Sequence, residues 1–355
     1  MERTKKTESL SVQMKRKVAN PTAKKKKEYD GDFGTVISTG STLLDLAISG
    51  GRIRGGGLPG GILVEAFGPS GSGKTVLLSE IAGAVQRQDG EIMFADPEAR
   101  LNKQFALMFG LDIKDENYSK PDTVTEVFNA VRKWKPTTPK KGKGPIHGIF
   151  ADSLAALSTN LEMEKDEGDK MGMRRPKEFS EQLRRTCRIL EKKNYLMVCS
   201  NQIRTNTSGY GQEFTTPGGL AMGFYSSLRL QFKFGKIPRL TLDKTIAGKK
   251  RTRIIGVDVL IEVAKSSIWK PYHSAPVTII FDYGIDDIRQ NLQYIKDYTD
   301  NKTYLVGDRK LDVSMSKSIR MVEKYGLEEE LKEEVINLWE EVEGKFASNR
   351  KPKIR

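Results

Sequence analysis

A short stretch of the chain, residues 68–75, carries glycine, lysine and hydroxyl side chains at fixed spacing, in the order Gly68, Pro69, Ser70, Gly71, Ser72, Gly73, Lys74 and Thr75. Glycines at these positions let consecutive backbone N–H groups turn inward around an anion. The spacing G-x-x-x-x-G-K-[S/T] brings the Lys74 ammonium to the β- and γ-phosphates of a nucleotide and the Thr75 hydroxyl to Mg²⁺. The stretch therefore predicts binding of a nucleoside triphosphate.

Two apolar stretches flank this loop and predict the elements that position it. Residues 61–67 are typical of a buried strand, and residues 76–82 are typical of a helix. A helix that begins at the loop directs the positive end of its dipole toward bound phosphate. The alternative, a glycine-rich turn that binds nothing, leaves this strand–loop–helix order unexplained.

Two carboxylates follow other apolar stretches. Glu98 comes just after residues 91–96, and Asp152 ends the stretch that begins at residue 146. Parallel strands end at one edge of a sheet, where α/β proteins place their chemistry. We expect Asp152 to hold Mg²⁺ through water and Glu98 to polarise the water that attacks the γ-phosphate. Glu98 has an alternative role, as a charge at a helix start.

Composition limits the classes of function. The 355 residues include 60 Lys and Arg against 46 Asp and Glu, a net charge of +14, which favours a polyanionic partner, nucleic acid before membrane. A basic surface that serves only solubility is an equal alternative. Two cysteines and two histidines argue against a disulfide framework, a histidine-rich metal site and a histidine-based triad. No apolar run approaches the roughly 18 residues of a membrane span, so we expect a cytoplasmic protein.

Two long polar stretches have no clear period. Residues 162–177 mix charges, methionine and glycine, and residues 204–219 are rich in Gly, Thr and Ser, with Tyr210 and Phe214. Loops of this length inside compact domains are usually functional or disordered. Aromatic and arginine side chains in the second stretch suit stacking on a single nucleic-acid strand.

The rest of the chain predicts antiparallel strands and two flanking regions. Residues 224–234, 253–265 and 275–283 alternate as strands do, with a basic hairpin at residues 239–253. The first thirty residues hold ten basic and four acidic side chains, which is typical of a flexible arm. We expect three regions: a basic N-terminal arm (1–33), a core (34–285) and a small helical C-terminal domain (286–355).

Residues 34–285 resemble a RecA-type strand-exchange recombinase. Besides the phosphate loop, the resemblance rests on separate motifs at residues 37–41 with 44–45, 56–59, 152–157, 171–172, 201–204, 215–219 and 224–225 with 229–230. The most specific is Asn-Gln-Ile-Arg at 201–204, followed by a Thr/Gly-rich loop and Phe-Tyr. The resemblance implies an α/β fold with a RecA-like P-loop ATPase core, whose mostly parallel central sheet is extended by antiparallel strands.

The resemblance also implies an activity. A member of this family uses ATP and Mg²⁺, forms a helical filament on single-stranded DNA, and pairs it with double-stranded DNA for strand exchange. By the same resemblance, Glu98 activates water, Gln202 senses the γ-phosphate, and Phe105 stacks on adenine. Lys265 matches the first of two lysines that a neighbouring subunit inserts at the phosphates. Ser267 stands where the second lysine would be, which is a departure from the family.

The two polar stretches correspond to the two DNA-binding loops of the family. Residues 168–177 match the first loop, with Met171, Gly172, Arg174 and Arg175 as candidate contacts. Residues 205–218 match the second loop, and the candidates in and around it are Arg204, Thr205, Tyr210, Phe214, Thr215, Thr216, Gly218 and Gly219.

Two other functions stay open at this point. One is a ring-forming motor of the DnaB helicase type, which shares the ATPase core and differs in forming closed hexamers. The other is an ATP-gated filament that coats single-stranded DNA and hydrolyses ATP weakly, which the missing second lysine keeps possible.

Overall fold

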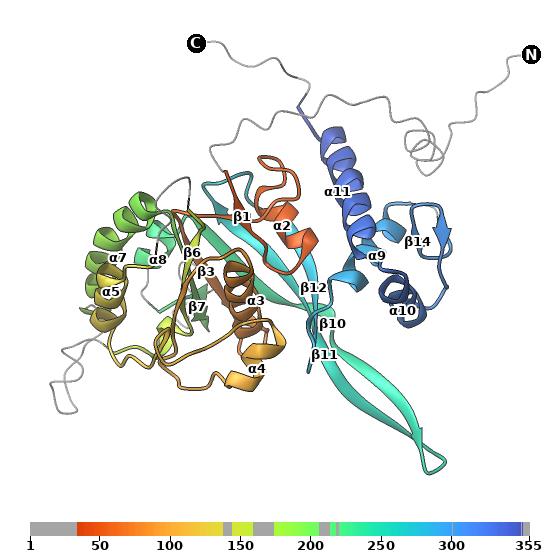
Figure 1. The fold of residues 1–355 in the computed structure, drawn as a ribbon, viewed down its shortest axis with the longest axis horizontal. Coiled ribbons are helices and arrows are strands. Elements are labelled where there is room, and N and C mark those ends of the chain that lie inside the picture. Colours follow the sequence, from red (N-terminus) through yellow and green to blue (C-terminus); the bar gives the residue numbers. More distant parts are fainter. Residues whose placement is uncertain are drawn as a thin grey trace, which may run out of the picture.

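A nine-stranded sheet forms the centre of the protein (Figure 1), in a computed structural model that describes residues 34–137, 144–158, 174–205, 214–217, 220–299, 301–348 and 350. The strand order is β13-β12-β11-β10-β3-β7-β6-β4-β5. In chain order these strands are β3 (Leu63–Gly68), β4 (Ile92–Ala95), β5 (Tyr118–Ser119), β6 (His147–Ala151), β7 (Tyr195–Gln202), β10 (Leu228–Ile246), β11 (Lys249–Ser266), β12 (Ser274–Ile280) and β13 (Gly284–Ile285).

The pairing between neighbouring strands changes from parallel to antiparallel at β10. Strands β10, β3, β7, β6, β4 and β5 pair in parallel, whereas β10 with β11, β11 with β12, and β12 with β13 are antiparallel. The α/β fold with a mostly parallel sheet extended by antiparallel strands is therefore confirmed. The carboxyl ends of the parallel strands meet at one edge, where the phosphate loop begins.

Helices cover both faces of the sheet. Helices α5 (Val124–Lys133), α7 (Arg174–Lys193) and α8 (Leu220–Tyr225) pack on one face, where Leu63, Met197 and Cys199 belong to their apolar cluster. On the other face, α2 (Thr42–Ser49) and α3 (Lys74–Arg87) join the cluster of Val64, Ala66 and Val198. Successive residues of one strand thus face opposite clusters, so the strands read as continuous apolar runs.

The C-terminal segment shares the second cluster. Helices α9 (Asp287–Asp297), α10 (Met315–Tyr325) and α11 (Glu328–Lys345) contribute residues including Leu292, Val322 and Leu331. Figure 1 shows α11 lying beside α2. The boundary at residue 286 remains a prediction. None of the helices that the structure describes is long and apolar enough to cross a membrane.

The remaining elements are short. They are β1 (Val36–Ile37) with β2 (Leu58–Pro59), α4 (Lys103–Met108), the 3-10 turn η1 (Leu154–Ala156), β8 (Arg204–Thr205) with β9 (Phe214–Thr215), and β14 (Leu305–Val306) with β15 (Arg309–Lys310).

Three expected boundaries are wrong. Residues 224–225 end helix α8 instead of beginning a strand, and β10 starts at Leu228. The hydroxyl and the backbone N–H of Ser226 both donate to the carbonyl of Met222, at 2.7 and 3.0 Å, so helical hydrogen bonding extends to Ser226 and the strand starts only after it. Residues 174–177, expected in the first loop, form the first turn of α7. The second loop is closed at its base by the β8–β9 pair, which periodicity did not reveal.

The motif at residues 37–45 has a structural explanation. The Asp45 carboxylate, 3% exposed, accepts hydrogen bonds from Ser38 Oγ (2.5 Å), Thr39 N (2.8 Å) and Thr39 Oγ1 (2.7 Å). Burial raises the pKa of Asp45 to about 6, although these hydrogen bonds oppose the shift. The carboxyl group therefore ties the turn after β1 to helix α2.

We expect this carboxyl to give the fold an unusual pH dependence. Because its pKa in the folded state lies above the ordinary value of 3.8, the folded chain binds more protons than the unfolded chain between pH 4 and 6. Its contribution to stability therefore falls as pH rises through that window, by about 3 kcal/mol. Urea unfolding of wild type and Asp45→Asn at pH 4 and 7 measures this. The advantage of wild type over the variant should shrink at pH 7, and an unchanged difference would contradict the assignment.

Candidate functional site

The phosphate loop joins β3 to α3, and packing requires glycine at both of its ends. A Cβ on Gly68 would lie 2.7 Å from the backbone oxygen of Phe232 on β10. Gly73 has a φ of +88°, and a Cβ there would lie 2.1 Å from Ile279 Cδ1. At Gly71, no described atom lies within 4 Å of a Cβ. The loop thus has tight ends and an open middle, as a phosphate cradle needs.

Lys74, the first residue of α3, directs its ammonium over the loop. It is 8% exposed, and Nζ donates to the carbonyl oxygens of Gly68 (3.0 Å) and Pro69 (2.7 Å). Burial lowers the pKa of Lys74, while the carboxylates of Asp152 and Glu98 raise it. A phosphate oxygen is a stronger partner for this ammonium than a neutral carbonyl.

Asp152 lies directly beside the phosphate loop. Thr75 Oγ1 donates to its Oδ2 at 2.6 Å, and the Ser200 hydroxyl donates to Oδ1. Burial raises the pKa of Asp152, and both hydroxyl hydrogen bonds oppose that shift. Carboxylate and hydroxyl oxygens are hard ligands of the kind Mg²⁺ prefers, so the residues present fit this ion.

Glu98 lies between β4 and α4, close to the same place. Its Oε1 accepts from Ser153 Oγ at 3.1 Å, and its Oε2 pairs with Arg100 at 2.7 Å. Helix α4 begins at Lys103, with Asn102 as its N-cap, so Glu98 is not a charge in its first turn. The alternative role for Glu98 is therefore wrong.

Two residues near Glu98 in the sequence are Asp96, for which the sequence predicted no role, and Phe105, for which it predicted one. Asp96, which received no role, is 2% exposed and accepts from Tyr118 Oη (2.7 Å) and Leu101 N (2.8 Å). It therefore fixes the turn that carries Glu98. Phe105, expected to stack on adenine, is half-buried in α4 with its ring edge-on to Phe109 at 4.7 Å. Adenine stacking stays a prediction.

Gln202 is the last residue of β7 and its side chain is exposed. It pairs in register with Gly68, the start of the phosphate loop. Arg204, two residues later, begins β8 at the base of the second polar loop. One short segment therefore connects the phosphate loop with that polar loop.

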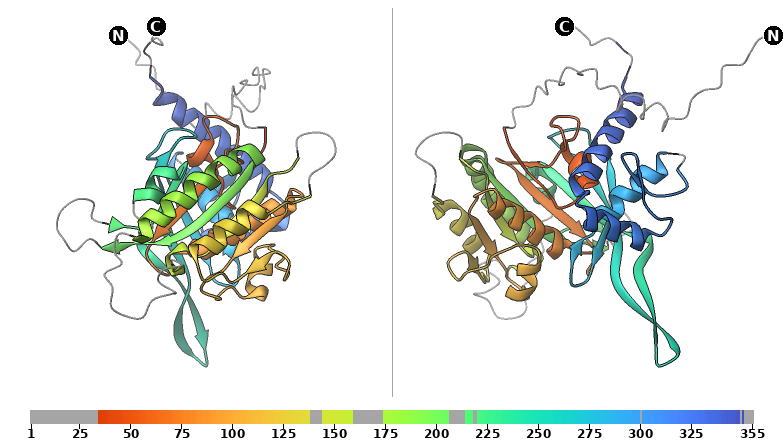
Figure 2. Two further views of the ribbon diagram at one scale, coloured as in Figure 1. Left: turned by 90° about the vertical axis from the view of Figure 1, so that its left-hand side faces the viewer. Right: turned by 45° about the vertical axis from the view of Figure 1, so that its right-hand side comes forward.

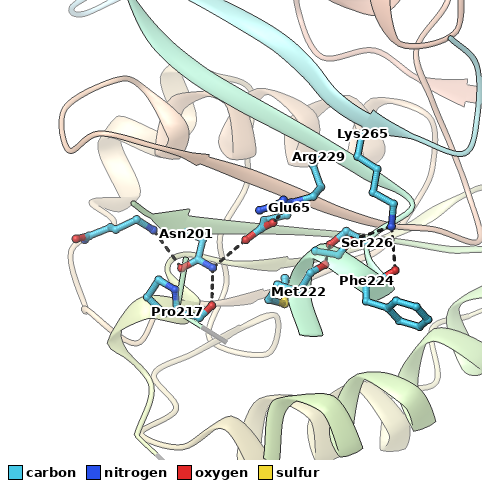
Figure 3. A network of polar contacts seen from close by, with 10 residues as sticks. Glu65, Asn201, Pro217, Met222, Phe224, Ser226, Arg229 and Lys265 are labelled. Atoms are coloured by element: carbon cyan, nitrogen blue, oxygen red, sulfur yellow. Dashed lines mark hydrogen bonds and ion pairs between the residues drawn. The ribbon is translucent and has the colours of Figure 1, made fainter. Parts of the chain in front are cut away.

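A buried ionic network lies next to this segment (Figure 3). Glu65 in β3 is fully buried, and its carboxylate pairs with Arg229 Nε at 2.6 Å. Asn201 Nδ2 donates to Glu65 Oε1 (3.0 Å) and to the carbonyl of Pro217 (2.9 Å). The Arg229 guanidinium also lies 4.4 Å from the centre of the Phe67 ring. The network joins β3, β7 and β10 to the far end of the second polar loop.

Lys265 reaches the same region from β11. Its Nζ donates to the carbonyl oxygens of Gly223 (2.8 Å) and Phe224 (2.9 Å) at the end of α8 (Figure 3). Burial lowers the pKa of Lys265, and the nearby charge of Arg229 adds to this. Phe224 is 76% exposed, so the end of α8 presents an aromatic ring beside this lysine.

The candidate DNA contacts are only partly described. Arg174 and Arg175 begin α7, Arg204 and Thr205 form β8, and Phe214 and Thr215 form β9. Thr216 is buried. The other candidates lie outside the described residues: Met171, Gly172, Tyr210, Gly218 and Gly219.

Sequence reasoning missed the Glu65 network. Asn201 and Arg229 were noticed only as parts of motifs, and Glu65 was counted within an apolar strand. A carboxylate inside a buried run is itself a signal, because burying an unpaired charge is costly and a partner must exist. The partners lie 136 and 164 residues away along the chain, so only the fold reveals them.

Comparisons with known proteins agree with this geometry. The family model described as the RecA N-terminal domain matches residues 15–286. "Protein RecA" of Anaplasma marginale (strain Florida) is 32% identical over 289 residues, which cover 81% of this chain and 74% of that protein. "Protein RecA" of Thermus thermophilus is 33% identical over 254 residues, which cover 71% of this chain and 69% of that protein.

We expect Arg229→Ala to destabilise the fold by about 3 kcal/mol, because it leaves the Glu65 carboxylate buried without its cation. Lys233→Ala is the matched control on the same strand, since its pair with Glu262 is far more exposed, at 43% and 28%. That change should cost less than about 1 kcal/mol. Urea unfolding measures the free energy of unfolding of both variants. Equal losses would show that the Glu65 network stabilises the fold no more than an exposed ion pair does.

Proposed function

We propose a function from one premise: the chain belongs to the RecA family, whose N-terminal-domain model matches residues 15–286. It is an ATP-dependent recombination and repair protein that forms a helical filament on single-stranded DNA and catalyses pairing and strand exchange with double-stranded DNA. The observation that carries this proposal is the register of Gln202 with Gly68, because the second polar loop, the proposed DNA contact, starts two residues after Gln202.

ATP and Mg²⁺ fit the residues at the edge of the sheet. The loop backbone and Lys74 would hold the phosphates, with Thr75 and Asp152 around the ion. Mg²⁺ would neutralise charge on the β- and γ-phosphates. Phe105 would stack on adenine after leaving its edge-on contact with Phe109.

Glu98 is the proposed general base. Its carboxylate is held by Ser153 and by the exposed Arg100, so its position is fixed from two sides. In this position it would orient a water molecule toward the γ-phosphate and accept its proton. The ammonium of Lys74 would then stabilise negative charge that develops on the phosphate oxygens.

Gln202 is the proposed link between the nucleotide and DNA. A side-chain amide at the end of β7 can bond to the γ-phosphate and loses that bond after hydrolysis. Such differential contact is what a switch between two states requires. The affected segment begins at Arg204 and returns through Pro217 to Asn201, so the Glu65 network would give the loop a fixed anchor. The candidate DNA contacts in both loops remain part of this proposal.

Lys265 is proposed to act on the nucleotide of a neighbouring subunit. To do so its ammonium must leave the carbonyls of Gly223 and Phe224. Ser267 donates instead to the carbonyl of Ser227 at 3.2 Å and brings no charge. One trans cation in place of two supports the second candidate, a DNA-coating filament with weak hydrolysis, and predicts reduced cooperativity.

Electron microscopy tests the assembly directly. With single-stranded DNA and a slowly hydrolysed ATP analogue, the proposal expects extended helical filaments. Closed rings would favour the helicase-type motor, and filaments that show neither strand exchange nor measurable ATP turnover in parallel assays would favour the coating filament.

Glu98→Gln should slow DNA-stimulated ATP hydrolysis by about a hundredfold or more, because the amide keeps the shape but accepts no proton. Nucleotide affinity should change little, whereas Lys74→Ala should lose it. Calorimetry and a phosphate-release assay separate the two effects. Turnover at the wild-type rate in Glu98→Gln would remove Glu98 from the mechanism.

Gln202→Ala should bind ATP but lose the stimulation of hydrolysis by single-stranded DNA, because the link from phosphate to loop is gone. The measurement is ATP turnover with and without DNA over a range of ATP concentrations. Gln88→Ala is a control for loss of an exposed amide distant in sequence from the loop. If Gln202→Ala is stimulated as strongly as wild type, coupling takes another route.

A further inference from the structure

Strands β10 and β11 continue beyond the sheet as a two-stranded ribbon. Strand β10 pairs with β3 only as far as Gln231, and β11 pairs with β12 only from Gly256 onward. Between these points and the turn, the two strands pair only with each other. We call residues 241–254 the distal ribbon. It projects clear of the body in Figure 1 and in both views of Figure 2.

The distal ribbon has no buried residue. Every position from 241 to 254 is exposed. A two-stranded ribbon without packing on either face is marginally stable in water. This segment therefore adds little to the core, and a ribbon of six residue pairs that packs on nothing is better explained by a role in binding.

The two faces of the distal ribbon differ in charge. Residues paired across two strands share a face, so the register assigns every side chain. On one face, Asp243 accepts from Thr252 (2.6 Å) and pairs with Lys250 (2.9 Å). The charge of this face is thus internally compensated.

The other face, the cationic face, has no acid. Its cross-strand pairs are Leu242 with Arg253, Lys244 with Arg251, and Ile246 with Lys249. Among the described residues, none of its four cations has an ion pair, although Lys250 on the opposite face has one. Leu242 and Ile246 lie between these cations and are 42% and 60% exposed. The cationic face therefore offers positive charges, unpaired among the described residues, and exposed aliphatic side chains, which suit an anionic partner with apolar edges.

The spacing of the cations fits a nucleic-acid backbone. Lys249, Arg251 and Arg253 follow each other at every second position of β11, so they span about 14 Å. One DNA strand presents a phosphate about every 3.4 Å of axis, so this row covers about four phosphates. Lys244 adds a charge from the facing strand.

Duplex DNA fits this surface better than a single strand. Single-strand sites combine cations with aromatic rings for stacking, and residues 235–268 contain no Phe, Tyr or Trp. The major groove of duplex DNA, about 12 Å wide, admits a two-stranded ribbon, and aliphatic side chains there contact thymine methyl groups. Leu242 and Ile246 are placed for such contacts.

We propose that the cationic face of the distal ribbon binds duplex DNA, through Lys244, Lys249, Arg251 and Arg253. Strand β10 runs parallel to β3 and leaves the sheet at the edge where the phosphate loop and Gln202 lie. This inference rests on the proposed function, because there the bound duplex lies on the same side as the loops that hold the single strand. It assigns capture of the duplex to a segment separate from those loops.

The test replaces all four residues of the cationic face by glutamine. The matched control replaces Lys302, Lys310, Lys317 and Lys324, four exposed lysines of the C-terminal segment, so both variants lose the same net charge. Fluorescence anisotropy measures binding of a blunt 30-base-pair duplex and of a 30-nucleotide single strand across a range of salt, with a slowly hydrolysed ATP analogue present. Circular dichroism checks that both variants are folded.

For duplex DNA, we expect the ribbon variant to lose at least tenfold in affinity and its salt slope to become shallower by about 3 to 4, since each phosphate contact contributes about 0.9. Single-strand binding and its stimulation of ATP hydrolysis should stay within twofold of wild type. Failure of wild type to bind the single strand or hydrolyse ATP would defeat the proposed function, while the duplex result still tests the ribbon.

Other outcomes overturn the inference. An equal loss of duplex binding in the control variant would show that net charge alone matters. An equal loss of single-strand binding in the ribbon variant would assign the face to the single strand. Unchanged duplex binding, with loss of filaments or of binding to anionic phosphatidylserine vesicles, would assign it to a neighbouring subunit or to a membrane surface.

Discussion

The buried pair of Glu65 and Arg229 is the interaction on which the arrangement of the candidate site depends. A fully buried carboxylate is tolerated only when cations and hydrogen-bond donors compensate it. Here the compensation comes from two other strands, through Arg229 on β10 and Asn201 on β7. The charge thus fixes the lateral order of the three strands that carry the phosphate loop, the Gln202 segment and the start of the ribbon.

This constraint separates fixed parts of the molecule from parts that must change partners. The strand ends are held by the register and by the contact of Gly68 with Phe232, so the phosphate loop has little freedom. In contrast, Lys74 and Lys265 bond to backbone carbonyls, which are weaker partners for an ammonium than a phosphate. Rigid strands with exchangeable lysine contacts are suited to a protein that responds to a nucleotide without refolding.

The sequence was sufficient wherever the signal is local. The phosphate loop, its flanking strand and helix, and the strand before Asp152 are continuous patterns, and they were predicted within a few residues. Residues 224–225 were assigned to a strand as part of an alternating stretch, but they form the end of helix α8, and the strand starts only at Leu228. The Glu65 network was not predictable from pattern, because its members come together only through the pairing of distant strands. Residues 239–253 were correctly expected as a hairpin. The alternation alone did not show that its two strands extend beyond the residues that pair with β3 and β12.

Strand β10 carries two kinds of cation: one that is paired with a buried carboxylate inside the fold, and one that faces solvent and has no ion pair among the described residues. At its start Arg229 pairs with the buried Glu65, so removing either partner would destabilise the fold. Near its tip Lys244 lies in solvent, where an unpaired cation costs little and stays available to an external anion. The net charge of +14 is therefore not a uniform property of the surface. Along this strand it changes from compensated to uncompensated as the sheet ends, so a polyanion that meets the ribbon is held by charges that the fold itself does not need.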